Sequence, residues 1–289
     1  MISRLLINKL PLWRGQKKIG TNLAPNILEH MVRNIVNNKY PIKTNHIEDL
    51  KLNDIRGYNI KKHKTPYSTW NINHIRNINN NDYKEGDMIL NLGGDHGITI
   101  GTLPPMLERY PNLKVIWIDA HADINSPETS DTGNFHGMPV YFISDLSDCE
   151  DNNIKLPLKN LQYYGVRDLD EAESNRIINN NIRNYVKDEI DNRSLDVVID
   201  DIINDNELLD NPVHLSIDID SIDPKYCPST GTCVDNGLDI KDVTELCKRI
   251  KETGNLVSID LVEFNPLIGN EEDVRKTTDT IDKILKSFL

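Results

Sequence analysis

The sequence predicts an α/β protein, with one three-layer α/β/α domain built around a mostly parallel central sheet. Short apolar runs alternate along the chain with longer segments of helical period, as in successive strand–helix units. Several of these runs are almost continuously apolar, which is typical of strands that helices cover on both faces. Clusters of aspartate and histidine directly follow three of the runs. This pattern indicates a site at the carboxyl edge of the sheet.

The individual elements follow from the same periodicities. The expected strands are 5–8, 88–92, 114–119, 161–166, 213–218 and 255–260, and the expected helices are 25–39, 99–110, 171–180, 195–209, 240–253 and 272–287. The stretch from about 41 to 86 is less regular and rich in asparagine and lysine, but it is too short and too mixed for a disordered linker. Because no Pro/Gly/Ser hinge divides the chain, residues 1–289 are expected to form a single domain.

The beginning of the chain has two interpretations. Five basic residues and no acidic one precede Glu29, a composition that also occurs in mitochondrial transit peptides. However, the segment SRLLINKL resembles a first strand, and PNILEHMVRNIVNNK has the period of an amphipathic helix. The strand and helix are the favoured interpretation.

Composition excludes several classes of protein. The formal charge is −12, which argues against a nucleic-acid binder with a basic face. No apolar stretch is long enough to span a bilayer, so no membrane association is expected. The four cysteines, Cys149, Cys227, Cys233 and Cys247, form no CxxC pair or disulfide framework. Reduced thiols and a cytoplasmic location are therefore expected.

Three short motifs carry the chemistry. They are GGDH at 93–96, DAHAD at 119–123 and DID at 218–220, and their candidate metal ligands are His96, Asp119, His121, Asp123, Asp218 and Asp220. Carboxylate and imidazole ligands without thiolates suit ions of the manganese type. Six ligands are too many for one ion but enough for two ions that share bridging carboxylates, and such pairs activate water for hydrolysis. Asp95 is expected to support a turn.

Strand geometry suggests how these ligands could converge. A strand period of two would place Asp119, His121 and Asp123 on one face and would pair Asp218 with Asp220. Each motif alone has an ordinary explanation, since a DxD often lies in a turn and a lone histidine is usually a surface residue. Three ionisable groups on one face beside an apolar strand would be costly to bury without metal. Together the motifs favour a metal site.

Polar groups elsewhere supply further candidates. The segment 125–139 reads as a loop, and His136 within it is either an acid–base group or a structural histidine. Asp168 and Asp170 end another strand, where they could cap a helix that begins near 171. Glu263 follows an apolar strand, where it could pair with a cationic substrate or lie at the rim.

The motifs resemble the ureohydrolase family, and within it the arginases. The resemblance covers nearly the whole chain through WRGQKKIGTNLAPNILE, GGDHGITIG, DAHADINSPETSDTGNFHGMPV, YYGVRDLD, LSIDIDSIDPKYCPSTGT and SIDLVEFNP. It implies the arginase/deacetylase-like α/β/α fold and two Mn²⁺ ions per chain. His96, Asp119, Asp123 and Asp218 match the ligands of one ion, and Asp119, His121, Asp218 and Asp220 match those of the other. Asp119 and Asp218 would bridge the two ions.

The same resemblance implies roles around the metals. His136 matches the proton-shuttling histidine, and Glu263 matches the carboxylate that holds the guanidinium. Asp123 is further expected to orient the attacking hydroxide by a hydrogen bond. Asn125, Thr132 and Asn134 match the loop that recognises an α-carboxylate, Asp170 matches the residue that contacts the α-amino group, and Thr232 is a further substrate contact. The chain departs from the family pattern at Thr132 (usually serine), Gly97 (usually serine) and Phe264 (usually a smaller aliphatic residue). These departures bear on affinity and remove no ligand.

The implied activity is manganese-dependent hydrolysis of L-arginine to L-ornithine and urea by a hydroxide shared between the ions. The alternatives are another ureohydrolase acting on agmatine, guanidinobutyrate or formiminoglutamate, and a non-catalytic arginine-binding homologue. A deacetylase-like zinc hydrolase fits less well, because such a site holds one metal and fewer carboxylates. The resemblance also implies a homo-oligomer, either a trimer or a hexamer.

Overall fold

Eight parallel strands form one sheet in the computed structural model, which describes residues 2–47, 75, 82–147, 154–205 and 207–289. The strand order is β2-β1-β3-β8-β7-β4-β5-β6. The strands are β1 (Arg4–Leu10), β2 (Ile42–His46), β3 (Asp87–Gly93), β4 (Lys114–Ile118), β5 (Leu161–Tyr164), β6 (Arg183–Tyr185), β7 (Val213–Asp218) and β8 (Leu256–Val262). The predicted α/β/α fold is confirmed.

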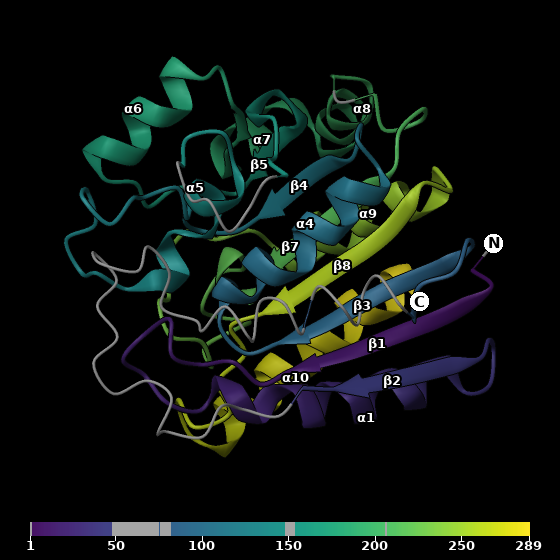
Figure 1. The fold of residues 1–289 in the computed structure, drawn as a ribbon. Helices are drawn as coiled ribbons and strands as arrows, with labels where there is room; N and C mark the ends of the chain where they lie inside the picture. The colour runs from purple at the N-terminus through teal and green to yellow at the C-terminus, as the bar shows by residue number, and fades with distance from the viewer. Residues whose placement is uncertain (1, 48–74, 76–81, 148–153, 206) are drawn as a thin grey trace.

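Helices cover both faces of the sheet (Figure 1). The helices are α1 (Ala24–Val36), α4 (Thr99–Arg109), α5 (Pro139–Ile143), α6 (Glu171–Asn179), α7 (Lys187–Arg193), α8 (Leu195–Asp205), α9 (Ile240–Glu252) and α10 (Glu271–Phe288). One core contains apolar side chains of α1, α8, α9 and α10, and the other contains those of α4 and α5. Consecutive residues of β4 alternate between them: Ile116 lies in the first core and Trp117 in the second.

The structure contains every strand and helix that the sequence predicts, and two further strands lie at the edges of the sheet. β2 is only half-buried and carries Lys, Thr, Asn and His, while β6 has three residues. Edge strands need no continuous apolar run, because one side of each faces solvent or a loop. The segment at 41–86 therefore begins with a strand. Residues 48–74 and 76–81 of that segment, and Cys149, lie outside the described residues.

The N-terminal segment takes the strand and helix interpretation. β1 pairs with β2 on one side and with β3 on the other, and α1 packs its apolar face into the core through Leu28 and Val32. Among the described residues, no helix has the length and apolar composition needed to cross a membrane.

Candidate metal centre and substrate cavity

Four adjacent strands position the candidate site at their carboxyl ends. In the order β3-β8-β7-β4 they lead into His96, Glu263, Asp218 and Asp119 respectively. Their arrowheads point to the same edge of the sheet in Figure 1. Because these strands are parallel neighbours, residues separated by more than a hundred positions meet there. All six predicted metal ligands lie in this region.

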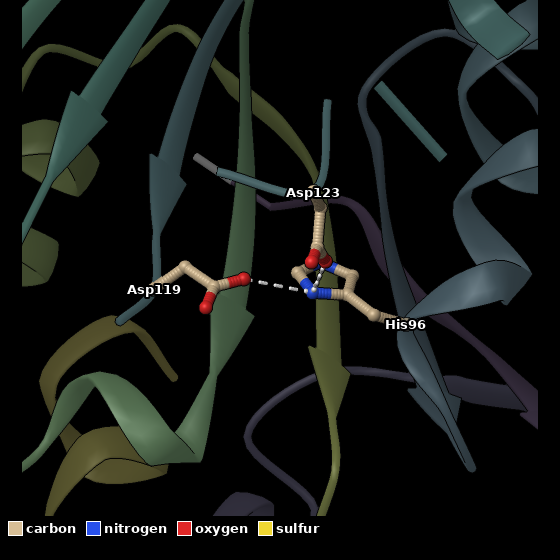
Figure 2. A group of neighbouring side chains, drawn as sticks. All are labelled: His96, Asp119 and Asp123. Carbon is tan, nitrogen blue, oxygen red and sulfur yellow. Dashed lines mark ion pairs between the residues drawn. The ribbon is translucent and has the colours of Figure 1, made fainter. Parts of the chain in front are cut away.

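The first group of ligands surrounds the Nδ1 atom of His96 (Figure 2). This nitrogen lies 3.0 Å from Asp119 Oδ2, 3.1 Å from Asp123 Oδ2 and 3.4 Å from Asp218 Oδ2. It is fully buried, and among the described residues it has no partner in hydrogen-bonding geometry. A buried imidazole nitrogen facing three carboxylate oxygens suits a cation that all four atoms would share.

A second group forms around His121. Its Nδ1 atom lies 3.1 Å from Asp220 Oδ2 and 3.5 Å from Asp119 Oδ1. The potential ligand atoms of Asp119, His121 and Asp220 all lie within 4.8 Å of one another, as do those of His96, Asp119 and Asp123. Asp119 belongs to both groups, with one oxygen directed toward each histidine. The arrangement therefore suits two neighbouring ions with Asp119 between them.

The electrostatics of the site also call for added positive charge. Burial and the nearby charge of Asp119 raise the pKa of Asp123 to about 6, and burial with Asp220 and Asp119 raises the pKa of Asp218 well above its usual value. Burial would raise the pKa of Asp119 as well, but hydrogen bonds with His121 and His96 lower it instead. Buried carboxylates this close together resist simultaneous ionisation. Divalent cations would relieve that repulsion, so the donor set fits the implied metals.

The local conformation differs from the expected strand alternation. β4 ends at Ile118, and Asp123 adopts a left-handed backbone conformation with φ 52°. The expectation that a strand places Asp119, His121 and Asp123 on one face is therefore wrong, although their side chains still converge. The DID motif likewise passes from β7 into a short 3₁₀ helix, where the Asp220 amide donates to Asp218 Oδ1 at 2.8 Å.

Neighbouring side chains hold the ligands in place. The Trp117 indole stacks on His96 with ring centroids 4.1 Å apart, and its Nε1–H donates to Asp119 Oδ2 at 2.9 Å. His96 Nε2 lies 2.7 Å from Ser216 Oγ. A metal on Nδ1 leaves Nε2 protonated, so the serine oxygen would accept that proton and fix the ring. These contacts leave the ligand atoms little freedom.

Asp95 supports the turn that carries His96. Its carboxylate accepts from Gly97 N at 3.0 Å and from Gly15 N at 2.7 Å. The chain passes so close to Leu12 that a Cβ at Gly94 would lie 1.7 Å from the Leu12 carbonyl oxygen. Only glycine allows that approach, which brings His96 over the end of β8.

Glu263 and His136 form a pair beside the metal ligands. Glu263 Oε1 lies 3.1 Å from His136 Nδ1 and accepts from the His96 backbone amide at 3.0 Å. Burial opposes charge on both groups, yet their mutual interaction raises the pKa of His136 to about 9 and lowers the pKa of Glu263. Glu263 has φ 67°, a conformation that a non-glycine residue adopts at some energetic cost and that often occurs at functional sites.

A cavity of about 310 Å³ opens beside this centre. This volume suits a small molecule. Among the lining residues are the predicted ligands His121, Asp123, Asp218 and Asp220 and the other predicted groups Asn125, Thr132, Asn134, His136, Asp170 and Thr232. Thr232 Oγ1 also donates to Asp220 Oδ2 at 2.9 Å. Glu263 is fully buried and is not among the residues that line this cavity.

Asp170 takes the helix-capping role and also lies at the cavity. Its carboxylate caps α6 by accepting from Glu173 N at 2.9 Å. Glu173 completes this capping box and lines the cavity too, a role that the sequence analysis missed. The spacing of an N-cap aspartate and a glutamate three residues later could have identified it. Burial, with Asp123 and Asp170 nearby, raises the pKa of Glu173 to about 7.

The protein has a parallel α/β sheet, and a candidate two-ion centre lies beside a polar cavity. These features define its class as an α/β hydrolytic enzyme whose site has ligands suited to metal ions. The chain belongs to the Arginase family, whose model matches residues 6–289. It is 32% identical to an arginase of Schizosaccharomyces pombe, over all of this chain and 94% of the relative. It is 34% identical to an arginase of Plasmodium berghei, over 91% of this chain and 82% of that protein.

The solved structures agree with this assignment. The Entamoeba histolytica arginase in complex with L-ornithine matches with a TM-score of 0.86 at 27% identity, over 98% of both chains. The fold and the family therefore agree along nearly the whole sequence.

Proposed function

We propose that this hydrolase converts L-arginine to L-ornithine and urea. The observation that carries the proposal is that two kinds of polar group line one cavity. One kind comprises carboxylate and imidazole groups suited to metal, and the other comprises the amides, hydroxyl and carboxylate of Asn125, Asn134, Thr132 and Asp170. A guanidinium group and an amino-acid group on one substrate would match these two kinds of group.

The proposed metals are two Mn²⁺ ions. His96, Asp119, Asp123 and Asp218 would hold one ion, and Asp119, His121, Asp218 and Asp220 the other. When bound, such ions would supply an acidified water for attack on the guanidinium carbon and positive charge to stabilise the developing negative charge. Asp123 would also accept a hydrogen bond from that water and orient it.

Glu263 and His136 would act on the substrate itself. The Glu263 carboxylate, held ionised by its donors, would fix the plane of the guanidinium through charge-assisted hydrogen bonds. His136, which burial and Glu263 together leave with a pKa of about 9, would be protonated at neutral pH. It would give its proton to the leaving amine as the carbon–nitrogen bond breaks.

The loop 125–134 would distinguish arginine from related guanidines. Asn125, Thr132 and Asn134 would donate hydrogen bonds to the α-carboxylate, and Asp170 would accept from the α-amino group. Agmatine lacks the carboxylate and would leave these donors unpaired, which is costly for a site built around them. The added methyl group of Thr132 lies among these groups.

Urea release from L-arginine, measured with and without added Mn²⁺, tests the proposal directly. We expect release only with the metal, and a kcat/KM for L-arginine far above those for agmatine, guanidinobutyrate and formiminoglutamate. Equal rates on agmatine and arginine would exclude the specificity argument. No release from any of the four compounds, with L-arginine still bound, would favour a non-catalytic arginine-binding protein.

Three further properties complete the proposal. One domain spans residues 1–289, because a single sheet draws strands from both halves of the chain. The chain assembles as a trimer or hexamer. Two exposed apolar side chains support this, Ile19 at 62% and Leu267 at 59% exposure. Their segments are joined by a hydrogen bond from the Asn265 side chain to the Ile19 carbonyl. The location is cytoplasmic, which the free thiols of Cys227, Cys233 and Cys247 support. Native mass measurement and cell fractionation test the last two properties.

A further inference from the structure

Arg176 lies on α6 and directs its side chain toward the loop 124–134. Its guanidinium makes three hydrogen bonds to the beginning of that loop. Nη1 donates to the Ile124 carbonyl at 2.5 Å and to Thr129 Oγ1 at 3.2 Å, and Nη2 donates to Ser126 Oγ at 3.0 Å. A planar guanidinium can bridge several acceptors in this way, which a single ammonium group cannot do.

The contacts of Arg176 distinguish it from an ordinary surface arginine. Within the described part of the chain, no carboxylate lies within ion-pair distance of its guanidinium, whereas at least one lies that close to each of Arg183, Arg193, Arg249 and Arg275. The Tyr141 ring lies 5.4 Å from the Arg176 guanidinium carbon. The positively charged guanidinium of Arg176 therefore donates its hydrogen bonds to neutral acceptors of the loop.

Thr129 transmits the position of Arg176 to Asn125. The Thr129 hydroxyl accepts from Arg176 and also from the Ser126 backbone amide at 3.0 Å, so its single proton remains available for one donated bond. Two acceptors lie within reach of that proton, and Asn125 Oδ1 at 2.7 Å is much nearer than the Ser126 carbonyl oxygen at 3.4 Å. The carbonyl side of the Asn125 amide is thereby fixed toward Thr129.

The other side of the same amide consequently carries the donors. Asn125 Nδ2 donates to Asp170 Oδ2 at 2.6 Å, and both residues line the cavity. Asp170 in turn caps α6, the helix that carries Arg176. The hydrogen bonds thus form a closed ring from α6 through the loop and back to α6. A reversed Asn125 amide would direct an oxygen atom at the Asp170 carboxylate and at any substrate carboxylate, where it would be repelled.

We propose that Arg176 is a positioning residue for substrate selection: it orients the Asn125 amide through Thr129, so that the cavity wall offers hydrogen-bond donors to an amino acid's α-carboxylate. This inference rests on the proposed function, because it concerns the same cavity. It adds a residue that touches no substrate atom and acts only through the loop.

The substitution Arg176→Met keeps much of the side-chain length and removes all three hydrogen bonds. We expect KM for L-arginine and the Kd of L-ornithine, measured by calorimetry on the Mn²⁺-loaded protein, each to rise about tenfold. We expect kcat, and kcat/KM for agmatine, to change by less than about twofold, since neither depends on the carboxylate contact. A general loss of structure would lower activity on both substrates together.

Two variants of Thr129 test the same relay without altering Arg176. Thr129→Val keeps the shape but removes the hydroxyl, so it should reproduce the effect on L-ornithine, whereas Thr129→Ser should restore wild-type affinity. The matched control is Arg249→Met, which removes a partly exposed guanidinium of α9 paired with Asp200 and should change neither affinity nor rate.

Unchanged L-ornithine affinity in both Arg176→Met and Thr129→Val would overturn the inference, as would equal losses on L-arginine and agmatine. If the wild-type chain binds L-ornithine but releases no urea from L-arginine, the proposed function fails. The inference then still depends on the L-ornithine affinities alone, so the two failures are distinguishable.

Discussion

Gln16 and Glu263 are joined by a buried hydrogen bond of 2.6 Å from Gln16 Nε2 to Glu263 Oε2, across 247 positions of the sequence. The other carboxylate oxygen of Glu263 accepts from the His96 amide and faces His136. Each oxygen of this carboxylate therefore has its own donor. A Cβ at Gly231 would lie 2.8 Å from Gln16 Oε1, so a glycine at that position leaves room for the amide.

The first prediction concerns this contact. Gln16→Leu removes one donor from a buried carboxylate that is proposed to hold the guanidinium. Hydrogen bonds to charged groups contribute about 1.5–3 kcal/mol, so kcat/KM for L-arginine should fall roughly 10- to 100-fold. Gln16→Glu should be worse, because it places a second carboxylate against Glu263. Steady-state kinetics at saturating Mn²⁺ would measure both effects.

A matched control is Gln162→Leu, which replaces another buried glutamine, on β5 and outside the cavity lining. It should keep wild-type kcat/KM. If Gln16→Leu behaved like Gln162→Leu, the contact would have no role in substrate binding.

The second prediction concerns the orientation of His96. Ser216→Ala removes the partner of His96 Nε2 and leaves the six proposed ligands unchanged. Supporting contacts of this kind typically alter metal affinity by about 10- to 100-fold, and we expect at least a tenfold loss. Competition with a chelator would measure the affinity, and activity should recover when Mn²⁺ is added in excess. Ser258→Ala, beside the buried His214, is the control, and equal metal affinity in the two variants would contradict the prediction.

The third prediction concerns Asp119, the residue shared by both ligand groups. Asp119→Ala should leave the chain unable to hold two ions and should lower kcat by more than about a thousandfold. Metal analysis after desalting, together with urea assays, would measure both effects. The control is Asp200→Ala, an exposed carboxylate that pairs with Arg249. Full activity with two metals per chain in Asp119→Ala would refute the proposed centre.

The central strands could be predicted because their residues are apolar enough to require burial on both faces. β3 and β7 are entirely buried, whereas the polar edge strands β2 and β6 show no such pattern. Local periodicity does not report strands that are stabilised by pairing at one edge. The order of the strands in the sheet could not be predicted from local patterns either. β8 and β7 lie between β3 and β4, which come much earlier in the sequence.

At the candidate site, too, some features could be predicted from local sequence and others depend on tertiary contacts. The motifs identified the ligand types, but the left-handed conformation of Asp123 depends on tertiary contacts and could not be read from DAHAD. Gln16 and Arg176 were missed for a related reason. Each acts on a residue distant in sequence, Glu263 in one case and Ile124 to Thr129 in the other, and no local spacing reports such a contact.

The last prediction is a pH dependence of stability that originates at Glu173. Its folded-state pKa is raised to about 7, above the ordinary value of 4.5, by burial and by the charges of Asp123 and Asp170. A carboxyl group with a raised pKa is neutral in the folded state below pH 4.5 at no cost. It destabilises the fold increasingly as the pH rises from 4.5 through 7. In the metal-free chain, Glu173→Gln should therefore raise the free energy of unfolding at pH 8, by on the order of 1 kcal/mol, and have little effect at pH 4.5.

Glutamine can still accept the capping hydrogen bond from Asp170 N, so the helix end is preserved. Urea denaturation at the two pH values would measure the difference, with Glu171→Gln, exposed on the first turn of the same helix, as the control. A stabilisation that is equal at both pH values would show that packing, rather than ionisation of the carboxyl group, is responsible.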